Sequence, residues 1–165
     1  MGDLNKLWPM IGNAADRYGL DPDLVAAMVL TESAANPYAV RYEPHVDRYV
    51  QDPEKHRPRG CSTETERRLQ MMSFGLMQVM GFNIRAMGYE GWLSEYLDPA
   101  KGLEVGCRFL VDLLRRWKSV EDAVSAYNQG SPRRGEDGRY RNQAYVDQVM
   151  TRYRRLAAKR RESET

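Results

Sequence analysis

The residue with the clearest potential for chemistry is Glu32, a carboxylate at the end of an otherwise apolar stretch. Read as a helix, this stretch places four residues on one face at the i, i+3, i+4 and i+7 positions: Val25, Met28, Val29 and Glu32. Burial on that face would raise the pKa of the carboxyl group, and the negative pole of the helix C-terminus would raise it further. A carboxyl group that stays protonated near neutral pH can donate its proton to a leaving group.

A simpler interpretation places Glu32 at the rim of the fold, hydrogen-bonded to a neighbouring backbone group. The helix pattern alone does not decide between the two interpretations. The cysteines and histidines indicate no second centre: Cys61 and Cys107 lack CxxC spacing, and His45 and His56 stand apart in a polar segment. No metal and no cofactor are therefore expected, while a disulfide between the two cysteines stays open.

The elements that must position Glu32 follow from capping signals. Asp21 and Pro22 begin its helix as N-cap and first helical residue, and Asn36-Pro37 ends it. Gly19 ends a preceding amphipathic helix.

Further helices are expected in the second half of the chain. Asp98-Pro99 begins an apolar helix that should be the central core helix. Ser119 with Asp122 resembles a capping box for a helix running to about Tyr127. A basic helix follows over residues 140–160. Because nearly every periodic segment has the helical repeat, the sequence predicts an all-α fold.

Residues 41–72 form a different, polar segment rich in proline and charge. We expect an insertion on the rim of a cleft, ordered or partly mobile, with a short helix from Thr63 to Met72 capped with Glu66. No alternating run is long enough to predict a sheet, although a short hairpin within 41–60 stays open.

Length and charge set the outer bounds. The 165 residues fit one domain covering 1–165, with a core of about 5–155. No run approaches the roughly 18 apolar residues of a membrane span, and the start shows no secretory signal. The net charge is +2, but from residue 131 onward ten basic residues face five acidic ones. This end favours polyanionic partners, nucleic acid among them, or forms the solvated face of a surface helix, which we prefer.

Four separated fragments carry a resemblance to one family: ESAANPYAV at 32–40, SFGLMQVM at 73–80, AYNQG at 126–130 and YVDQV at 145–149. In order and content they resemble the soluble lytic transglycosylase (SLT) domain, a lysozyme-like fold related to goose-type lysozyme. The resemblance covers roughly residues 5–155. The Arg41-Tyr42-Glu43-Pro44 start of the insertion resembles the branch found in phage, prophage and some bacterial cell-wall enzymes.

The resemblance implies cleavage of peptidoglycan between N-acetylmuramic acid and N-acetylglucosamine. Glu32 would first protonate the glycosidic oxygen. As carboxylate, it would then take the proton of the muramic C6 hydroxyl, which closes a 1,6-anhydro ring. The nucleophile belongs to the substrate, so one carboxyl group suffices where ordinary glycosidases need two.

The resemblance also implies substrate-binding roles for three residues around the second fragment. Ser73 would contact the N-acetyl or C6 region of a sugar, Gln78 would hold the sugar through its amide, and Met77 would line the subsite. Read alone, Met77 would be a plain core residue.

Three more residues are implied near the acid. Tyr127 would lie close to Glu32 and orient it through a hydrogen bond, Asn128 would fix that turn or contact the saccharide, and Tyr145 would close the far wall. Without the resemblance, core packing would be the simpler interpretation of both tyrosines.

Glu43, in the insertion, is a candidate second carboxylate. If it faced Glu32 with room for a water, hydrolysis would become feasible. An exposed salt-bridging role is the favoured interpretation for a residue of this type.

The expected enzyme is thus a monomeric lytic transglycosylase acting on glycan strands of the bacterial cell wall, in the periplasm. Without a visible signal peptide, it would be a phage lysin released through holin-type lesions or a trimmed secreted enzyme. Its rivals are a goose-type lysozyme-like hydrolase, a non-catalytic peptidoglycan-binding module and a helical nucleic-acid-binding protein. The last rival leaves the four fragments unexplained.

Overall fold

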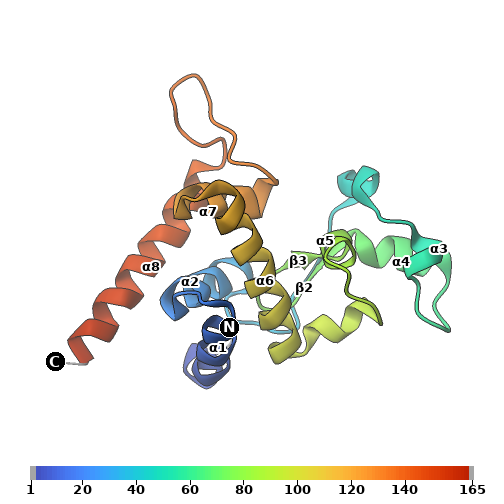
Figure 1. Ribbon diagram of the computed structural model, residues 1–165, viewed down its shortest axis with the longest axis horizontal. Helices are drawn as coiled ribbons and strands as arrows, with labels where there is room; N and C mark the ends of the chain where they lie inside the picture. The colour runs from blue at the N-terminus through green and yellow to red at the C-terminus, as the bar shows by residue number, and fades with distance from the viewer. Residues whose placement is uncertain (1–2, 164–165) are drawn as a thin grey trace.

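Capping residues and apolar stripes place the helices close to where the sequence predicts them. The computed structural model describes residues 3–163. The helices are α1 (Leu4–Tyr18), α2 (Pro22–Ser33), α3 (Pro53–His56), α4 (Thr63–Gln70), α5 (Gly81–Ala86), α6 (Pro99–Trp117), α7 (Val120–Gln129) and α8 (Gln143–Ser163). Two 3-10 helices, η1 (Pro44–Tyr49) and η2 (Leu93–Leu97), and three short strands, β1 (Val40–Tyr42), β2 (Met72–Phe74) and β3 (Val79–Met80), complete the fold (Figure 1).

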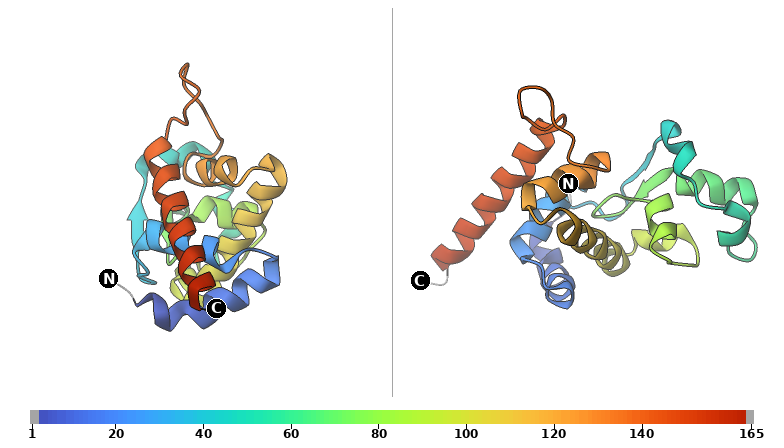
Figure 2. Two further views of the ribbon diagram at one scale, coloured as in Figure 1. Left: turned by 90° about the vertical axis from the view of Figure 1, so that its left-hand side faces the viewer. Right: turned by 45° about the horizontal axis from the view of Figure 1, so that its top comes forward.

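The mainly helical, lysozyme-like fold that the sequence predicts is confirmed. Helices α1, α2, α6, α7 and α8 form its body, with α2 packed against α1 and α8 and with α6 packed against α1 and α7. The C-terminal end of α8 and the segment holding α3 and α4 lie at opposite ends of the molecule (Figures 1 and 2). None of the helices in residues 3–163 is long and apolar enough to cross a membrane.

Helix α2 is more deeply buried than the sequence pattern predicts. Every residue from Asp23 to Val29 is buried, so the helix has no solvent face over two turns. An α-helix that is apolar all round lies in the core. Helix α6, expected as the central core helix, packs against α1, α7, η2 and β3. The last turn of α2 emerges from the core, and Ala34 (φ 51°) and Ala35 (φ 61°) turn the chain away before the proline that marks its end in the sequence.

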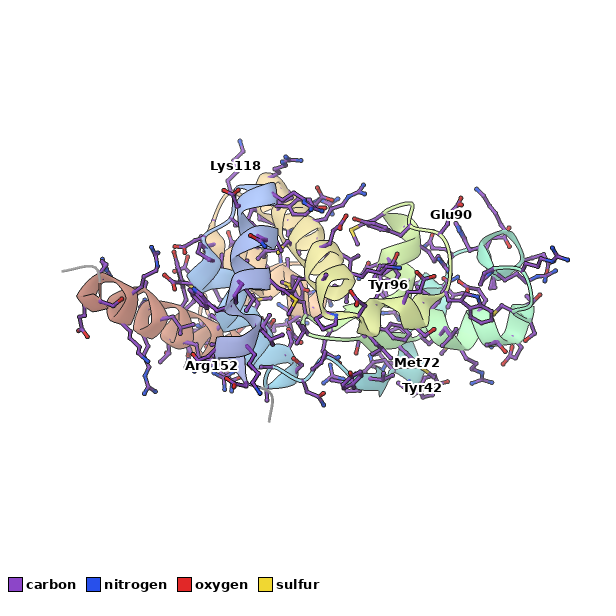
Figure 3. The ribbon with its side chains drawn as sticks, turned by 90° about the horizontal axis from the view of Figure 1, so that it is seen from below. Tyr42, Met72, Glu90, Tyr96, Lys118 and Arg152 are labelled. Carbon is purple, nitrogen blue, oxygen red and sulfur yellow. The ribbon has the colours of Figure 1, made fainter. Side chains whose placement is uncertain are left out.

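The expected insertion is ordered and closed at its base by a small antiparallel sheet in the order β1-β2-β3. Strand β1 pairs with β2, in a register that sets Tyr42 opposite Met72, and the two side chains lie side by side in Figure 3. The hairpin left open within 41–60 does not form. The strands are too short for alternation to predict them, because they have two or three residues each.

Inside the insertion, the expected cap of α4 is wrong. Ser62 is the N-cap and its hydroxyl accepts the backbone N–H of Thr65 at 3.0 Å. Glu66 instead lies on the side of α4 that faces α5, where Arg85 binds its carboxylate through two hydrogen bonds of 2.7 and 3.0 Å. Both side chains are fully buried, and Gln70 donates to the same carboxylate at 3.0 Å. This ion pair ties the insertion to the rest of the domain.

The question of a disulfide is also answered. Cys61 and Cys107 are both buried and both free. Burial raises the pKa of the Cys107 thiol to about 12, as expected of a small core residue.

Candidate active site

Glu32 lies in the last turn of α2, half-buried, on the wall of a cavity of about 700 Å³. One side of the cavity is formed by β1 and η1 of the insertion. The other side is formed by the C-terminal ends of α6 and α7 and the loop that follows α7. Glu32 has this position because most of α2 is buried and only its last turn, which carries Glu32, reaches the edge of the core.

Burial raises the pKa of Glu32 above its ordinary value. Two interactions act in the opposite direction: a hydrogen bond from Tyr145 and the positive charge of Arg41. The Tyr145 hydroxyl donates to Glu32 Oε1. Its own pKa is well above the ordinary value, first because the ring is buried and then because Glu32 is near, so it remains a donor. Because Oε1 accepts this bond, Oε2 is the carboxyl oxygen that Tyr145 leaves open for a proton.

The expectation that Tyr127 binds the Glu32 carboxyl group is therefore wrong. The Tyr127 hydroxyl donates to the backbone oxygen of Met77 at 2.8 Å. Tyr127 still lines the cavity and lies near Glu32, whose charge adds to burial in raising the pKa of the tyrosine. The physical reason is that α7 points Tyr127 at the turn between β2 and β3, whereas α8 runs along α2 and brings Tyr145 to the acid.

The residues of the second fragment build that turn. Gln78, in the left-handed region at φ 49°, donates from Nε2 to the backbone oxygens of Ala39 and Gly75, both at 2.9 Å. Ser73 is buried and donates to Gln78 Oε1 at 2.7 Å. Gln78 reaches the cavity wall, but its amide is occupied by these bonds, and the structure does not bring Ser73 to the cavity.

Met77 is fully buried and lies away from the cavity wall. It packs against Gly106 of α6, where an added Cβ would come within 2.3 Å of the Met77 sulfur. The glycine therefore lets α6 approach the turn. Met77 occupies the core position that its residue type alone would predict.

Asn128 lies at the cavity as expected, whereas Tyr145 does not close its far wall. Asn128 is exposed, lines the cavity and accepts a 3.0 Å hydrogen bond from Asn142 through Oδ1. This bond links the end of α7 to the chain before α8. Tyr145 lies behind Glu32 and is not part of the cavity wall.

Glu43 shares the cavity with Glu32. Its carboxylate binds Arg41 at 2.6 Å and lies 3.7 Å from His45, and 24 % of its side chain is exposed. The salt bridge favoured from the sequence forms, but Glu43 is half-buried and faces the cavity, not open solvent.

Much of the cavity wall is not predicted from the sequence. The unpredicted residues include several aromatic and basic side chains: Arg48, Tyr49, Phe82, Phe109, Arg116 and Arg133. Tyr49 of the insertion stacks on Phe82 with ring centroids 5.4 Å apart. Phe82 follows the second fragment closely, which was an available signal. The arginines carry no signal that separates them from ordinary surface charges.

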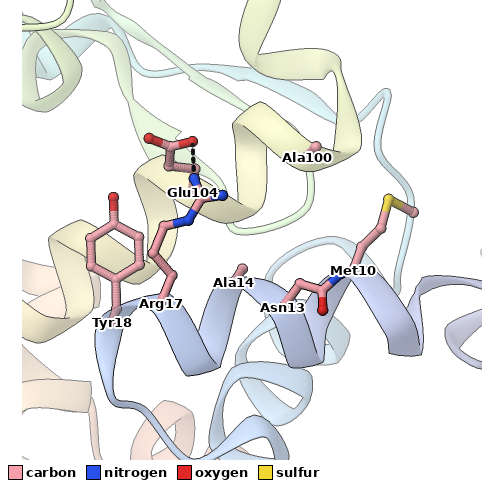
Figure 4. A pocket seen from close by; sticks show the side chains of 7 residues that line it. All are labelled: Met10, Asn13, Ala14, Arg17, Tyr18, Ala100 and Glu104. Atoms are coloured by element: carbon pink, nitrogen blue, oxygen red, sulfur yellow. Dashed lines mark hydrogen bonds and ion pairs between the residues drawn. The ribbon is translucent and has the colours of Figure 1, made fainter.

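A second, smaller pocket of about 240 Å³ lies between α1 and α6 (Figure 4). Arg17 crosses it to bind Glu104 at 3.2 Å. It contains none of the residues that the sequence singled out. Within residues 3–163, no group of three or more histidine, cysteine or acidic side chains could hold a metal ion.

Helix α8 anchors the acid-bearing helix at several points. Arg152 donates to the Thr31 hydroxyl at 2.8 Å, and Arg160 binds the buried carboxylate of Asp23 at 2.8 Å. The expected solvated basic face is therefore correct for the exposed Arg154 and Arg155 but wrong for these two arginines.

Comparison with known proteins adds a family match. The family model described as "Transglycosylase SLT domain" matches residues 9–149. No solved structure matches the chain significantly.

Among curated relatives, the chain is 28% identical over 124 residues to the "Transglycosylase" of Enterobacteria phage PRD1, covering 75% of this chain and 35% of that protein. It is 30% identical over 141 residues to "Membrane-bound lytic murein transglycosylase C" of Haemophilus influenzae (strain PittGG), covering 76% of this chain and 32% of that protein. The chain thus spans about a third of the length of these two relatives. The "Invasion protein IagB" of Salmonella typhimurium (strain SL1344) is 25% identical over 156 residues, which cover 93% of this chain and 81% of that protein.

Proposed function

The chain belongs to the transglycosylase SLT domain family, and from that premise we propose that it is a peptidoglycan lytic transglycosylase. It cleaves the β-1,4 bond between N-acetylmuramic acid and N-acetylglucosamine and leaves 1,6-anhydromuramic ends. The observation that carries the proposal is the carboxyl group of Glu32, which faces a cavity, has a pKa raised by burial and is held by Tyr145.

In the proposed reaction, Glu32 acts twice. Its protonated Oε2 gives a proton to the glycosidic oxygen while the bond from that oxygen to muramic C1 breaks, and N-acetylglucosamine leaves with a 4-hydroxyl group. The muramic C6 hydroxyl then attacks C1 and passes its proton to the Glu32 carboxylate. The acid is regenerated, so neither water nor an external base is consumed.

The surroundings of Glu32 support a one-carboxylate mechanism. Glu32 and Glu43 are the carboxyl groups on the described cavity wall, and Glu43 is bound by Arg41. The Glu43 carboxylate is thus engaged by a guanidinium group and is not aimed freely at a bound sugar. Tyr145 leaves the second oxygen of Glu32 free for proton transfer.

The same cavity also supports one rival, a goose-type lysozyme-like hydrolase. Glu43 shares the cavity with Glu32, and a carboxylate on the far side of the bond could activate a water if Arg41 released it. A non-catalytic peptidoglycan-binding module is the rival from another class, and in that case replacing Glu32 would change nothing that the protein does.

Digestion of purified sacculi separates these functions. Mass spectrometry of the soluble products should find anhydromuramic ends, and Glu32→Gln should abolish their release while the domain stays folded. Glu43→Gln should retain the anhydro products. Reducing ends that disappear in Glu43→Gln would instead establish the hydrolase, and the absence of any cleavage would favour the binding module.

We place the substrate in the bacterial cell wall, reached from the periplasmic side. The relatives named as a phage transglycosylase and a membrane-bound murein transglycosylase are consistent with either a phage lysin or a secreted bacterial enzyme. We further propose that residues 1–165 act as one domain and as a monomer.

A further inference from the structure

The cavity that holds Glu32 is strongly cationic, although the chain as a whole carries a net charge of only +2. Four arginines lie on its wall: Arg41, Arg48, Arg116 and Arg133. Glu43 is bound by Arg41 and so offsets one of them. Three guanidinium groups remain around a general acid that works in its neutral form.

These three arginines come from both sides of the cavity and have no acidic partner within the described residues. Arg48, on η1, lies over the ring of Tyr49 at 4.8 Å. Arg133, in the loop after α7, donates to the Ser131 hydroxyl at 3.2 Å. Arg116 is exposed in the last turn of α6.

The neighbouring arginine on α6 differs from Arg116 in both respects. Arg115 follows Asp112 on α6 and lies 3.8 Å from its carboxylate, and it does not line the cavity. Unpaired guanidinium groups that face one another across a cavity repel each other, and an anionic ligand would relieve that repulsion.

A glycan strand alone does not need these charges. The sugars of peptidoglycan are uncharged once the lactyl group of muramic acid is joined to a peptide, and the stacked rings of Tyr49 and Phe82 offer the apolar surface that sugar faces use. The negative charges lie on the peptide stems. Each stem grows from the muramic residue whose C1 bond is cleaved, so its first residues leave the sugar beside Glu32 and its carboxylates lie within a few residues' reach of the cavity wall.

We propose that Arg48, Arg116 and Arg133 bind carboxylates of these peptide stems, and that the site therefore prefers peptide-bearing glycan over peptide-free glycan. This inference rests on the proposed function and adds a preference among its substrates. Guanidinium groups suit the role, because their planar N–H fork matches a carboxylate.

Binding measured with the inactive Glu32→Gln protein tests this preference without turnover. The two ligands are soluble glycan fragments of equal length, one with intact peptide stems and one a chitin oligosaccharide, which carries neither peptide stems nor the lactyl carboxylates that an amidase would leave behind. We expect the peptide-bearing fragment to bind about tenfold more tightly at low salt, and the difference to shrink as salt screens the charges. Arg48→Gln, Arg116→Gln and Arg133→Gln should each weaken binding of that fragment by about two- to fivefold. Arg115→Gln is the matched control and should change nothing.

Equal affinity for the two fragments, or no binding of either, would overturn the proposal. Both results are obtained with the Glu32→Gln protein alone, without an arginine variant. A loss in the arginine variants that is the same for both fragments would also overturn it. So would a phosphate polymer such as single-stranded DNA that displaces the peptide-bearing fragment at equal charge concentration. Release of anhydro products from sacculi by the unmodified protein is followed in parallel, because it reports on the proposed function and not on this preference.

Discussion

The carboxyl group of Glu32 works against two neighbours that favour its ionised form. Tyr145 donates to it and Arg41 attracts its charge, yet burial outweighs both and keeps its pKa raised. Its proton affinity is thus a balance set by a buried helix end, one hydroxyl group and one guanidinium group. Such a balance can be tested by removing one neighbour at a time.

Tyr145→Phe removes the hydrogen bond that lowers the pKa of Glu32. That pKa should rise further, so the alkaline limb of the pH–rate profile, where the acid loses its proton, should move to higher pH. Turnover at the optimum should fall by about tenfold, as expected for a lost hydrogen bond to the reacting group. The pH dependence of product release from sacculi measures both effects.

Tyr153→Phe is the control for this change. It removes a hydroxyl on the same helix that binds Asp21 at 2.8 Å, away from Glu32. Its pH profile should match that of the unmodified protein. A profile that stays in place in Tyr145→Phe would contradict the role assigned to that hydroxyl.

Glu32→Gln should also show how much the Glu32 carboxyl group lowers the stability of the fold at high pH. A carboxyl group whose pKa is raised on folding contributes stability that is complete below the ordinary value of 4.5 and is lost as the pH rises through the raised pKa. The glutamine variant has no such loss. It should unfold at a higher temperature than the unmodified protein at pH 8 and at the same temperature near pH 4. A thermal melt in which Glu32→Gln is less stable at pH 8 would contradict the raised pKa.

At this scale the sequence predicts the acid but not its partner. Apolar neighbours and a helix end are local features, so they predict the partly buried helix-end position of Glu32 and the direction in which its pKa is shifted. Which tyrosine binds Glu32, Tyr127 or Tyr145, depends on how α7 and α8 pack near α2. That packing cannot be read from the residues next to either tyrosine in the sequence. The cavity arginines escape prediction for the same reason.

Among the elements, α4 and α5 depend on each other through the buried pair of Glu66 and Arg85. Arg85→Met should leave the Glu66 carboxylate buried without a cation and cost about 3–5 kcal/mol in the free energy of unfolding. The double variant Glu66→Met, Arg85→Met should recover most of that loss, because no buried charge remains. Urea unfolding of both variants measures this, and equal losses in the two would refute the explanation.

Helix boundaries are the best predicted elements. Asp21-Pro22, Asp98-Pro99 and Ser119 cap their helices as expected, because an N-cap acts on backbone groups two or three residues away. Glu66 fails as a cap since its real partner stands 19 positions later. The strands are not predicted for the same reason, because β1 pairs with β2 and the whole insertion separates the two in the sequence.

For the whole molecule, α8 connects the C-terminal end of the chain to the acid. Arg160→Ala should leave the Asp23 carboxylate, which is 1% exposed, without this cation and cost about 1–3 kcal/mol. The matched changes Arg154→Ala and Arg155→Ala lie on the exposed face and should cost less than about 0.5 kcal/mol. Chemical denaturation compares the three, and equal effects would contradict the view that α8 is clamped through Arg160.

The most direct test of the central claim is digestion of sacculi in water enriched in heavy oxygen, followed by mass spectrometry of the products. If Glu32 moves the proton and the muramic C6 hydroxyl supplies the nucleophile, the new ends carry the anhydro ring and no heavy oxygen, and Glu32→Gln releases none of them. Incorporation of one heavy oxygen at each new end, or undiminished cleavage by Glu32→Gln, would contradict the account.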